Sequence, residues 1–149
     1  MPKPVQRLLL PLIAVACYLF GALGLGLSAY RADAHHGRGR RIAAFAIASI
    51  GILIHAAALV DERRLDPYAV LSLGDTLALV ALVIAITAVV MAVQPRRRGM
   101  AALLLGIAAV LEAAFSEGAR EFSVGRPGWE LAFHVAMATT AFAFLTIGA

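Results

Sequence analysis

The sequence predicts an all-α fold, an integral membrane bundle of five transmembrane helices. Of its 149 residues, 62% are hydrophobic, and the mean hydropathy is +0.87, whereas a soluble domain has about 45–50% apolar residues. The surplus lies in long apolar blocks, each near the ~20 residues that a helix needs to cross a bilayer. The five predicted spans form one transmembrane domain and cover about residues 8–30, 42–60, 68–93, 100–115 and 129–149.

The basic residues lie at the ends of the apolar blocks. The net charge is +4, but the arginines are not interleaved with aromatic residues, so we expect a lipid bilayer and no nucleic acid as partner. Loops 31–41 and 94–99 carry seven arginines, and the other two loops carry four. The positive-inside rule then favours loops 31–41 and 94–99 in the cytoplasm and the N-terminus outside, although Lys3 and Arg7 reduce the asymmetry.

The N-terminal block is expected to stay as a span. Lys3 and Arg7 precede it, and Ala32-Asp33-Ala34 is similar to a signal-peptide cleavage site. However, the apolar run exceeds the about 7–15 residues of a signal-peptide core, and charged residues crowd the supposed site.

Motifs for thiol or hydrolytic chemistry are absent from the sequence. Cys17 is the single cysteine, so no intramolecular disulfide and no C-x-x-C motif can exist. There is no HExxH motif and no evident nucleophile, so we do not expect an enzyme. His35 and His36 are adjacent in a glycine- and arginine-rich loop, where a solvated pair is a better interpretation than a metal site.

Small residues recur at helical spacing in two spans. Cys17, Gly21, Gly24 and Ser28 share one face of the first span, which predicts close packing of another helix. In the second span a similar face places His55 toward the bundle interior, and Gly51, one turn before it, leaves room for a flat ligand. The residues of that face are Ala44, Ala48, Gly51, His55 and Ala58.

The ionisable residues of the spans gather toward one end of the bundle. His55 lies five residues before Val60, and His134 lies five after Trp129, so at ~1.5 Å per residue both lie about 7–8 Å below the same surface. Because ionisable groups inside a membrane are costly, we interpret them as functional. The sequence predicts a polar pocket on the non-cytoplasmic side, with further members Ser72, Asp75, Glu112, Trp129 and Glu130.

Three uses of this pocket stay open at this point. Neutral imidazoles on facing helices are good axial ligands for haem iron, and nearby carboxylates can orient them. The same groups can relay protons or bind a cation in a small transporter or permease-like subunit. In the third case, a structural subunit, the polar side chains only fix helix packing.

Three segments, in this order, resemble the cytochrome c assembly family of haem-handling membrane proteins, in particular its CcsA/HemX-like branch. They are LIHAAAL at 53–59, LSLGDTL at 71–77 and PGWELAFHV at 127–135. The second is similar to the family's PLSN-x-YESL stretch, with Asp75 where an acidic residue is usual. The third is similar to its W-x-x-x-HV opening of a span. The resemblance covers the chain from the second span to the end.

The resemblance implies haem handling in a bacterial inner membrane, as a conduit and not as a catalyst. His55 and His134 would then bind haem or line its path, and other cytochrome c maturation subunits or an apocytochrome would be partners. The family's tryptophan-rich haem loop has no counterpart in this sequence, which has one tryptophan. We therefore expect the chain to be the N-terminal portion of a longer family architecture.

Overall fold

The computed structural model describes residues 4–30, 37–65, 73–115 and the single residue 138, and this part of the chain is helical. Its elements are α1 (Pro4–Tyr30), α2 (Gly37–Leu65), α3 (Leu73–Ala92), the 3₁₀ helix η1 (Pro95–Arg97) and α4 (Arg98–Phe115). The predicted all-α class is confirmed for these residues. The fifth predicted span, 129–149, lies outside them apart from Ala138.

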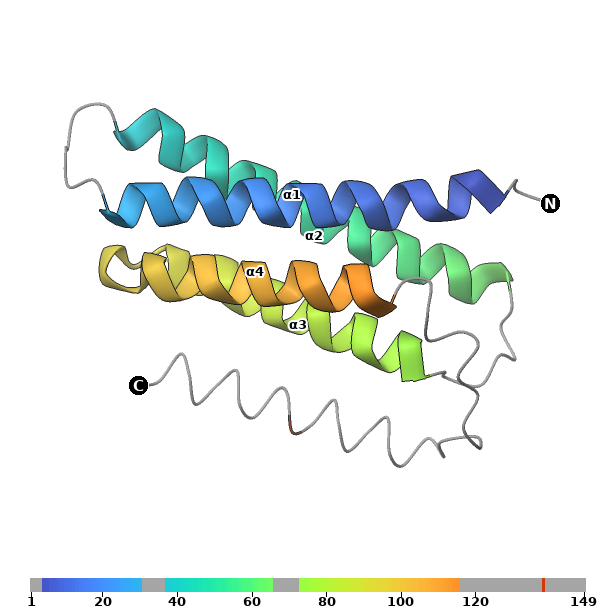
Figure 1. Cartoon of the computed structure of the whole chain (residues 1–149). Coiled ribbons are helices and arrows are strands. Elements are labelled where there is room, and N and C mark those ends of the chain that lie inside the picture. The colour runs from blue at the N-terminus through green and yellow to red at the C-terminus, as the bar shows by residue number, and fades with distance from the viewer. Residues whose placement is uncertain (1–3, 31–36, 66–72, 116–137, 139–149) are drawn as a thin grey trace.

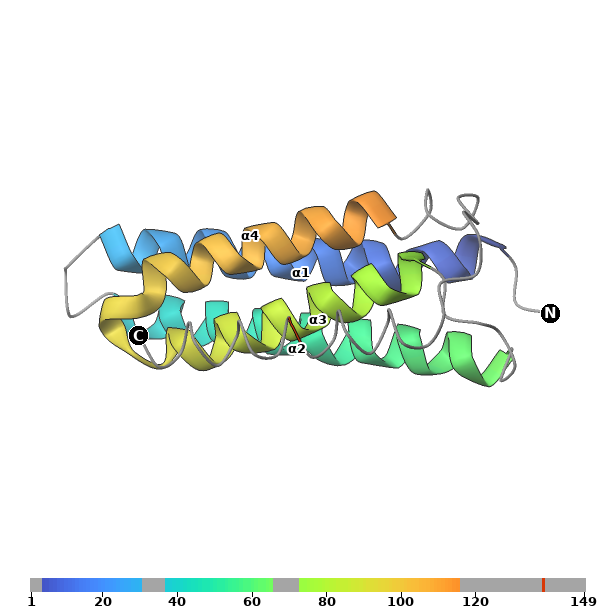
Figure 2. The ribbon, with the colours of Figure 1, turned by 90° about the horizontal axis from the view of Figure 1, so that it is seen from below.

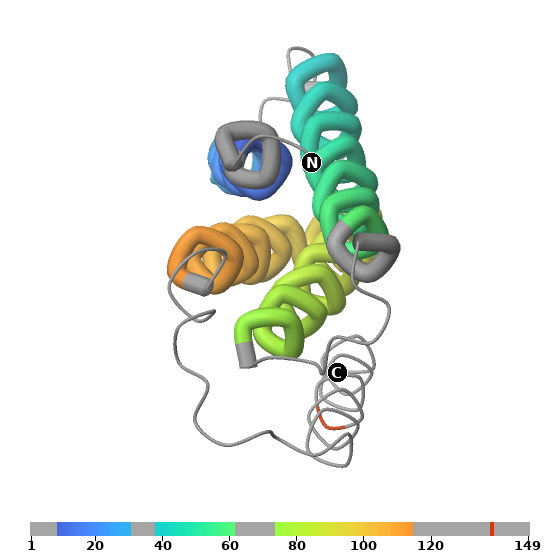
Figure 3. Tube along the Cα trace, turned by 90° about the vertical axis from the view of Figure 1, so that its right-hand side faces the viewer, coloured from blue at the N-terminus to red at the C-terminus, as the bar shows by residue number. Residues whose placement is uncertain are grey.

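The four α-helices run up and down beside one another (Figure 1). α1 packs against both α2 and α4, while α3 packs mainly against α4, as the end-on view shows (Figure 3). The start of α2, η1 and the start of α4 lie at one end of the bundle, which we call the arginine end (Figures 1 and 2). The end of α2, the start of α3 and the end of α4 lie at the opposite end, which we call the polar end.

Three of the described helices are long and apolar enough to cross a membrane: Leu9–Tyr30, Arg38–Asp61 and Gly74–Ala92. Their packing is the reverse of that in a soluble protein, because small residues fill the inside and large ones face outward. Ala48, Ala85 and Ala108 are completely buried, whereas Leu53 is 69% and Phe20 64% exposed. An apolar exterior around a core of small residues suits lipid as the solvent.

Helices α1, α2 and α4 extend further than the predicted spans. α2 runs over Gly37–Leu65, so parts of the expected loops 31–41 and 61–67 are helical, and η1 with the first turn of α4 occupies the expected loop 94–99. Hydropathy marks the hydrocarbon layer only. A helix keeps its backbone hydrogen bonds internal and can continue with charged residues past that layer. The predicted loop boundaries were wrong for this reason.

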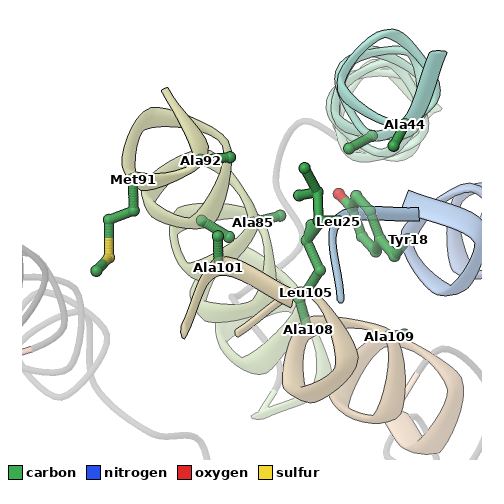
Figure 4. Packing of buried hydrophobic residues seen from close by; sticks show 12 residues of the cluster. Tyr18, Leu25, Ala44, Ala85, Met91, Ala92, Ala101, Leu105, Ala108 and Ala109 are labelled. Atoms are coloured by element: carbon green, nitrogen blue, oxygen red, sulfur yellow. The ribbon is translucent and has the colours of Figure 1, made fainter. Parts of the chain in front are cut away.

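The predicted small-residue face of the first span is confirmed as a packing face. A Cβ added at Gly24 would lie 2.5 Å from the Cβ of Ala44, and one at Gly21 would lie 2.9 Å from that of Ala48. α1 and α2 therefore approach each other almost backbone to backbone. Tyr18, Leu25, Leu105 and several alanines complete the core between α1, α2, α3 and α4 (Figure 4).

Candidate functional site

Three polar side chains from three helices meet inside the bundle. The hydroxyl oxygen of Tyr18 lies 3.0 Å from His55 Nδ1, and His55 Nε2 lies 2.9 Å from Glu112 Oε2. The three residues are 0%, 1% and 4% exposed, respectively. We call them the Tyr-His-Glu array. It joins α1, α2 and α4 through buried polar contacts that replace water as hydrogen-bonding partners.

Close packing of α1 on α2 positions Tyr18 against His55. A Cβ added at Gly51 would lie 2.8 Å from the Cβ of Cys17 and 3.1 Å from two ring carbons of Tyr18. The tyrosine ring thus occupies the space that the sequence offered to a flat ligand beside His55. The two rings are tilted by 52°, with their centroids 6.0 Å apart, so the contact between them runs through the hydroxyl group.

The inner face of α4 supplies Glu112, the third member of the array. Ala101, Leu105, Ala108 and Glu112 recur at spacings of four, three and four along this helix, and all are buried. Residues at this spacing share one helix face. Glu112 is the last buried member of the stripe, one turn before α4 ends at Phe115, so its carboxylate sits at the polar end.

The array is buried in the half of the bundle nearer the polar end. His55 lies six residues before Asp61 on α2, a rise of about 9 Å. Tyr18 packs at the level of Gly51, one turn deeper. Toward the arginine end the described core continues with Leu25, Ala44 and Ala85, and the Thr87 hydroxyl donates to the carbonyl of Val83 in its own helix. The array therefore lies closer to the polar end than to the arginine end.

The contact between His55 and Glu112 is close but poorly aligned. At 2.9 Å it is an ion-pair distance, yet neither His55 Nε2 nor Glu112 Oε2 makes a hydrogen bond of good geometry with any described residue. The distance therefore establishes that the two groups are in contact, but not that they form a well-aligned hydrogen bond.

The array can hold a proton without rearrangement of the helices. With neutral His55 and ionised Glu112, Tyr18 donates to Nδ1 and the ring N–H faces the carboxylate, leaving one buried negative charge. One added proton, on either His55 or Glu112, makes the array neutral overall. The Tyr18 hydroxyl serves both states, because it can donate to a bare Nδ1 or accept from a protonated one.

Of the other predicted pocket residues, some lie in the described helices and others lie outside the described residues. Asp75 and Thr76 lie in the first turn of α3, also at the polar end; Thr76 is buried, and both residues make interactions. His134, Ser72, Trp129 and Glu130 lie outside the described residues. Within the described helices no three His, Cys, Asp or Glu side chains gather as a metal site would require. The structure thus brings together His55 and Glu112 and adds Tyr18.

Tyr18 was missed from the sequence because it lies in an uninterrupted apolar run. The signal was present in the spacing: Ala14, Tyr18, Gly21 and Leu25 recur at four, three and four. Ala14, Tyr18 and Leu25 are at most 1% exposed. A hydroxyl-bearing aromatic residue on the inward face of a span needs a buried partner, and His55 is that partner.

No family model matches the chain, and no curated protein or solved structure matches it either. The resemblance to the cytochrome c assembly family and the haem cofactor that it implies stay predictions.

Replacing Tyr18 with phenylalanine is expected to lower the free energy of unfolding by about 1–3 kcal/mol, because His55 Nδ1 then stays buried without a donor. Tyr30→Phe is the matched control, since Tyr30 is 89% exposed at the end of α1, and it should change stability by less than about 0.5 kcal/mol. Denaturant unfolding in detergent micelles measures both variants. Equal losses would show that the Tyr18 hydroxyl has no role in holding the array.

Proposed function

We propose that this chain is a five-span membrane protein in which the Tyr-His-Glu array takes up and passes a proton, as part of a transporter- or permease-like subunit. The observation that carries the proposal is the contact of 2.9 Å between His55 and Glu112 in the bundle interior. A carboxylate and an imidazole in contact can pass a proton between them.

The burial of the array supports a functional role over a purely structural one. An ion pair withdrawn from solvent is a weak source of stability, since its desolvation offsets most of the Coulomb attraction, and well-packed apolar residues often do as well. The neighbouring core shows that this chain packs alanines and leucines tightly where only packing is needed. A costly polar array at one end of such a core therefore favours proton binding.

The setting that we propose is a bacterial inner membrane with the arginine end in the cytoplasm and the N-terminus outside. Arg38, Arg40 and Arg41 begin α2, and Arg96, Arg97 and Arg98 lie in η1 and at the start of α4, so the positive-inside rule orients the bundle. In this orientation the array takes up its proton from the outer side. If a substrate is moved together with the proton, the change of charge on the array would couple the two movements.

The test of this function is proton flux into liposomes that contain the purified protein and a pH-sensitive dye, under an imposed membrane potential. We expect wild type to change the internal pH faster than protein-free liposomes, and His55→Gln to fall to the protein-free rate. Asp61→Asn is the control, because Asp61 is an exposed acid on the same helix, and it should keep the wild-type rate. Equal rates for wild type and His55→Gln would contradict the proposal.

Haem handling is the second candidate, and it rests on the resemblance of the three segments. The described geometry does not fit axial ligation by His55, because Nδ1 faces Tyr18 and Nε2 faces Glu112, and iron needs a free ring nitrogen. Absorption spectra of oxidised and reduced protein, beside His55→Ala and His134→Ala, decide this candidate. A six-coordinate haem spectrum that both substitutions remove would support it. A folded wild type without haem after haem loading would end it.

A further inference from the structure

We propose that the arginine end binds the phosphate headgroup of an anionic phospholipid at the first turns of α2 and α4, through Arg41 and Arg98. This site is separate from the Tyr-His-Glu array and lies at the opposite end of the bundle (Figures 1 and 2). It does not depend on the proposed proton relay.

The acidic residues of the described helices keep away from the arginine end, whereas basic residues lie at both ends. Six arginines belong to the described arginine end: Arg38, Arg40, Arg41, Arg96, Arg97 and Arg98. The described acidic residues, Asp61, Glu62, Asp75 and Glu112, all belong to the polar end or its flank. The acid nearest in sequence to these arginines is Asp33, outside the described residues. The described arginine end therefore has a large excess of positive charge, for which an anion is the natural counterpart.

The side chain of Arg98 indicates where such an anion would bind. Its Nε atom is buried and makes no hydrogen bond with any described residue. Burial, and next the positive charge of Arg41, lower the pKa of the Arg98 guanidinium. Two arginines thus stand near each other from two different helices, and one presents a buried donor without an acceptor. A phosphate group accepts hydrogen bonds from two guanidinium groups and removes both the repulsion and the unmet donor.

A lipid fits this end better than a free phosphate ion because apolar side chains continue directly from the arginines. Ile42 follows Arg41 and is 59% exposed, while Met100 and Leu103 follow Arg98 and are 50% and 60% exposed. A phospholipid places its charged headgroup at the arginines and its acyl chains along such side chains. A free ion would use the arginines alone.

The experiment compares two lipids with identical acyl chains, phosphatidylglycerol and phosphatidylcholine, added to the full chain in detergent. Thermal unfolding and native mass spectrometry report stabilisation and retained lipid. We expect phosphatidylglycerol to bind preferentially, and Arg41→Gln and Arg98→Gln each to weaken that binding about fivefold. Arg98→Lys should also weaken it, since lysine lacks the Nε donor. Arg64→Gln, which removes one charge from the end of α2 at the opposite end of the bundle, is the control and should retain wild-type binding.

Each other outcome overturns the assignment. Equal retention of the two lipids would show that the headgroup charge is not recognised. An equal loss of lipid binding in Arg64→Gln would show that binding depends only on the net charge of the protein. Equal stabilisation by inorganic phosphate at the same concentration would make the site one for a free anion. Should Arg98→Gln fail to fold, Arg41→Gln carries the test, because Arg41 lies in the first turns of α2 beside exposed residues.

Discussion

Glu112→Gln is expected to leave a folded protein that has lost its proton flux, whereas Glu112→Ala loses both flux and stability. The glutamine side chain keeps the volume and an oxygen that accepts from the ring N–H of His55, but it takes up no proton. Alanine leaves that buried N–H without a partner, which costs about 1–3 kcal/mol of unfolding free energy. The reason for both effects is the contact of 2.9 Å between Glu112 and His55. Liposome flux and denaturant unfolding measure the two effects separately.

This pair of substitutions separates the relay from a structural tie. A structural subunit would need only the polar contact between the two side chains, so Glu112→Gln would then behave as wild type in every assay. Asp61→Asn controls for loss of an acidic group in general, since Asp61 is exposed on α2. A Glu112→Gln protein with full stability and undiminished proton flux would contradict the proposed role of the carboxyl group.

Gly24→Ala is expected to destabilise the bundle by about 1–3 kcal/mol, although alanine is the better helix former, because it overpacks the α1–α2 contact. The added methyl group would lie 2.5 Å from the Cβ of Ala44, well inside van der Waals contact. The two helices must then move apart, and this movement would also loosen Tyr18 from His55. Thermal unfolding and the proton flux of the reconstituted variant measure the two consequences.

Two variants make this test specific. Within the described chain nothing lies within 4 Å of a Cβ at Gly106, so Gly106→Ala should be neutral or stabilising by up to about 1 kcal/mol. The double variant Gly24→Ala with Ala44→Gly restores the spacing and should recover most of the stability. If the double variant is as unstable as Gly24→Ala alone, close approach at this point does not hold the helices together.

The fold was predictable where one physical requirement dominates. Blocks of apolar residues near the thickness of a bilayer can only be helices, and helices were found at each described block. The helix-packing faces were predictable too, because Gly21, Gly24 and Gly51 mark the places where backbones approach. The helix ends were not predictable, because charged residues such as Arg41 and Asp61 flank the predicted span while the helix continues past them.

The sequence identified two of the residues that form the site, but not how these residues contact one another. His55 and Glu112 were conspicuous as ionisable residues within apolar segments, and spacing placed His55 on an inward face. That they meet depends on how α4 packs relative to α2, which no local pattern specifies. Tyr18 escaped notice because a tyrosine among apolar residues is ambiguous until its neighbour is known, and that neighbour lies 37 positions away in the sequence.

The most direct measurement is the infrared difference spectrum of the reconstituted protein when the pH is stepped down, recorded for wild type and Glu112→Gln. The account predicts a carboxylic-acid C=O band that appears in wild type, is missing in Glu112→Gln and persists in Asp61→Asn. A change of imidazole bands in the same spectrum would report the share of the proton carried by His55. Identical spectra for wild type and Glu112→Gln would contradict the claim that this array takes up a proton.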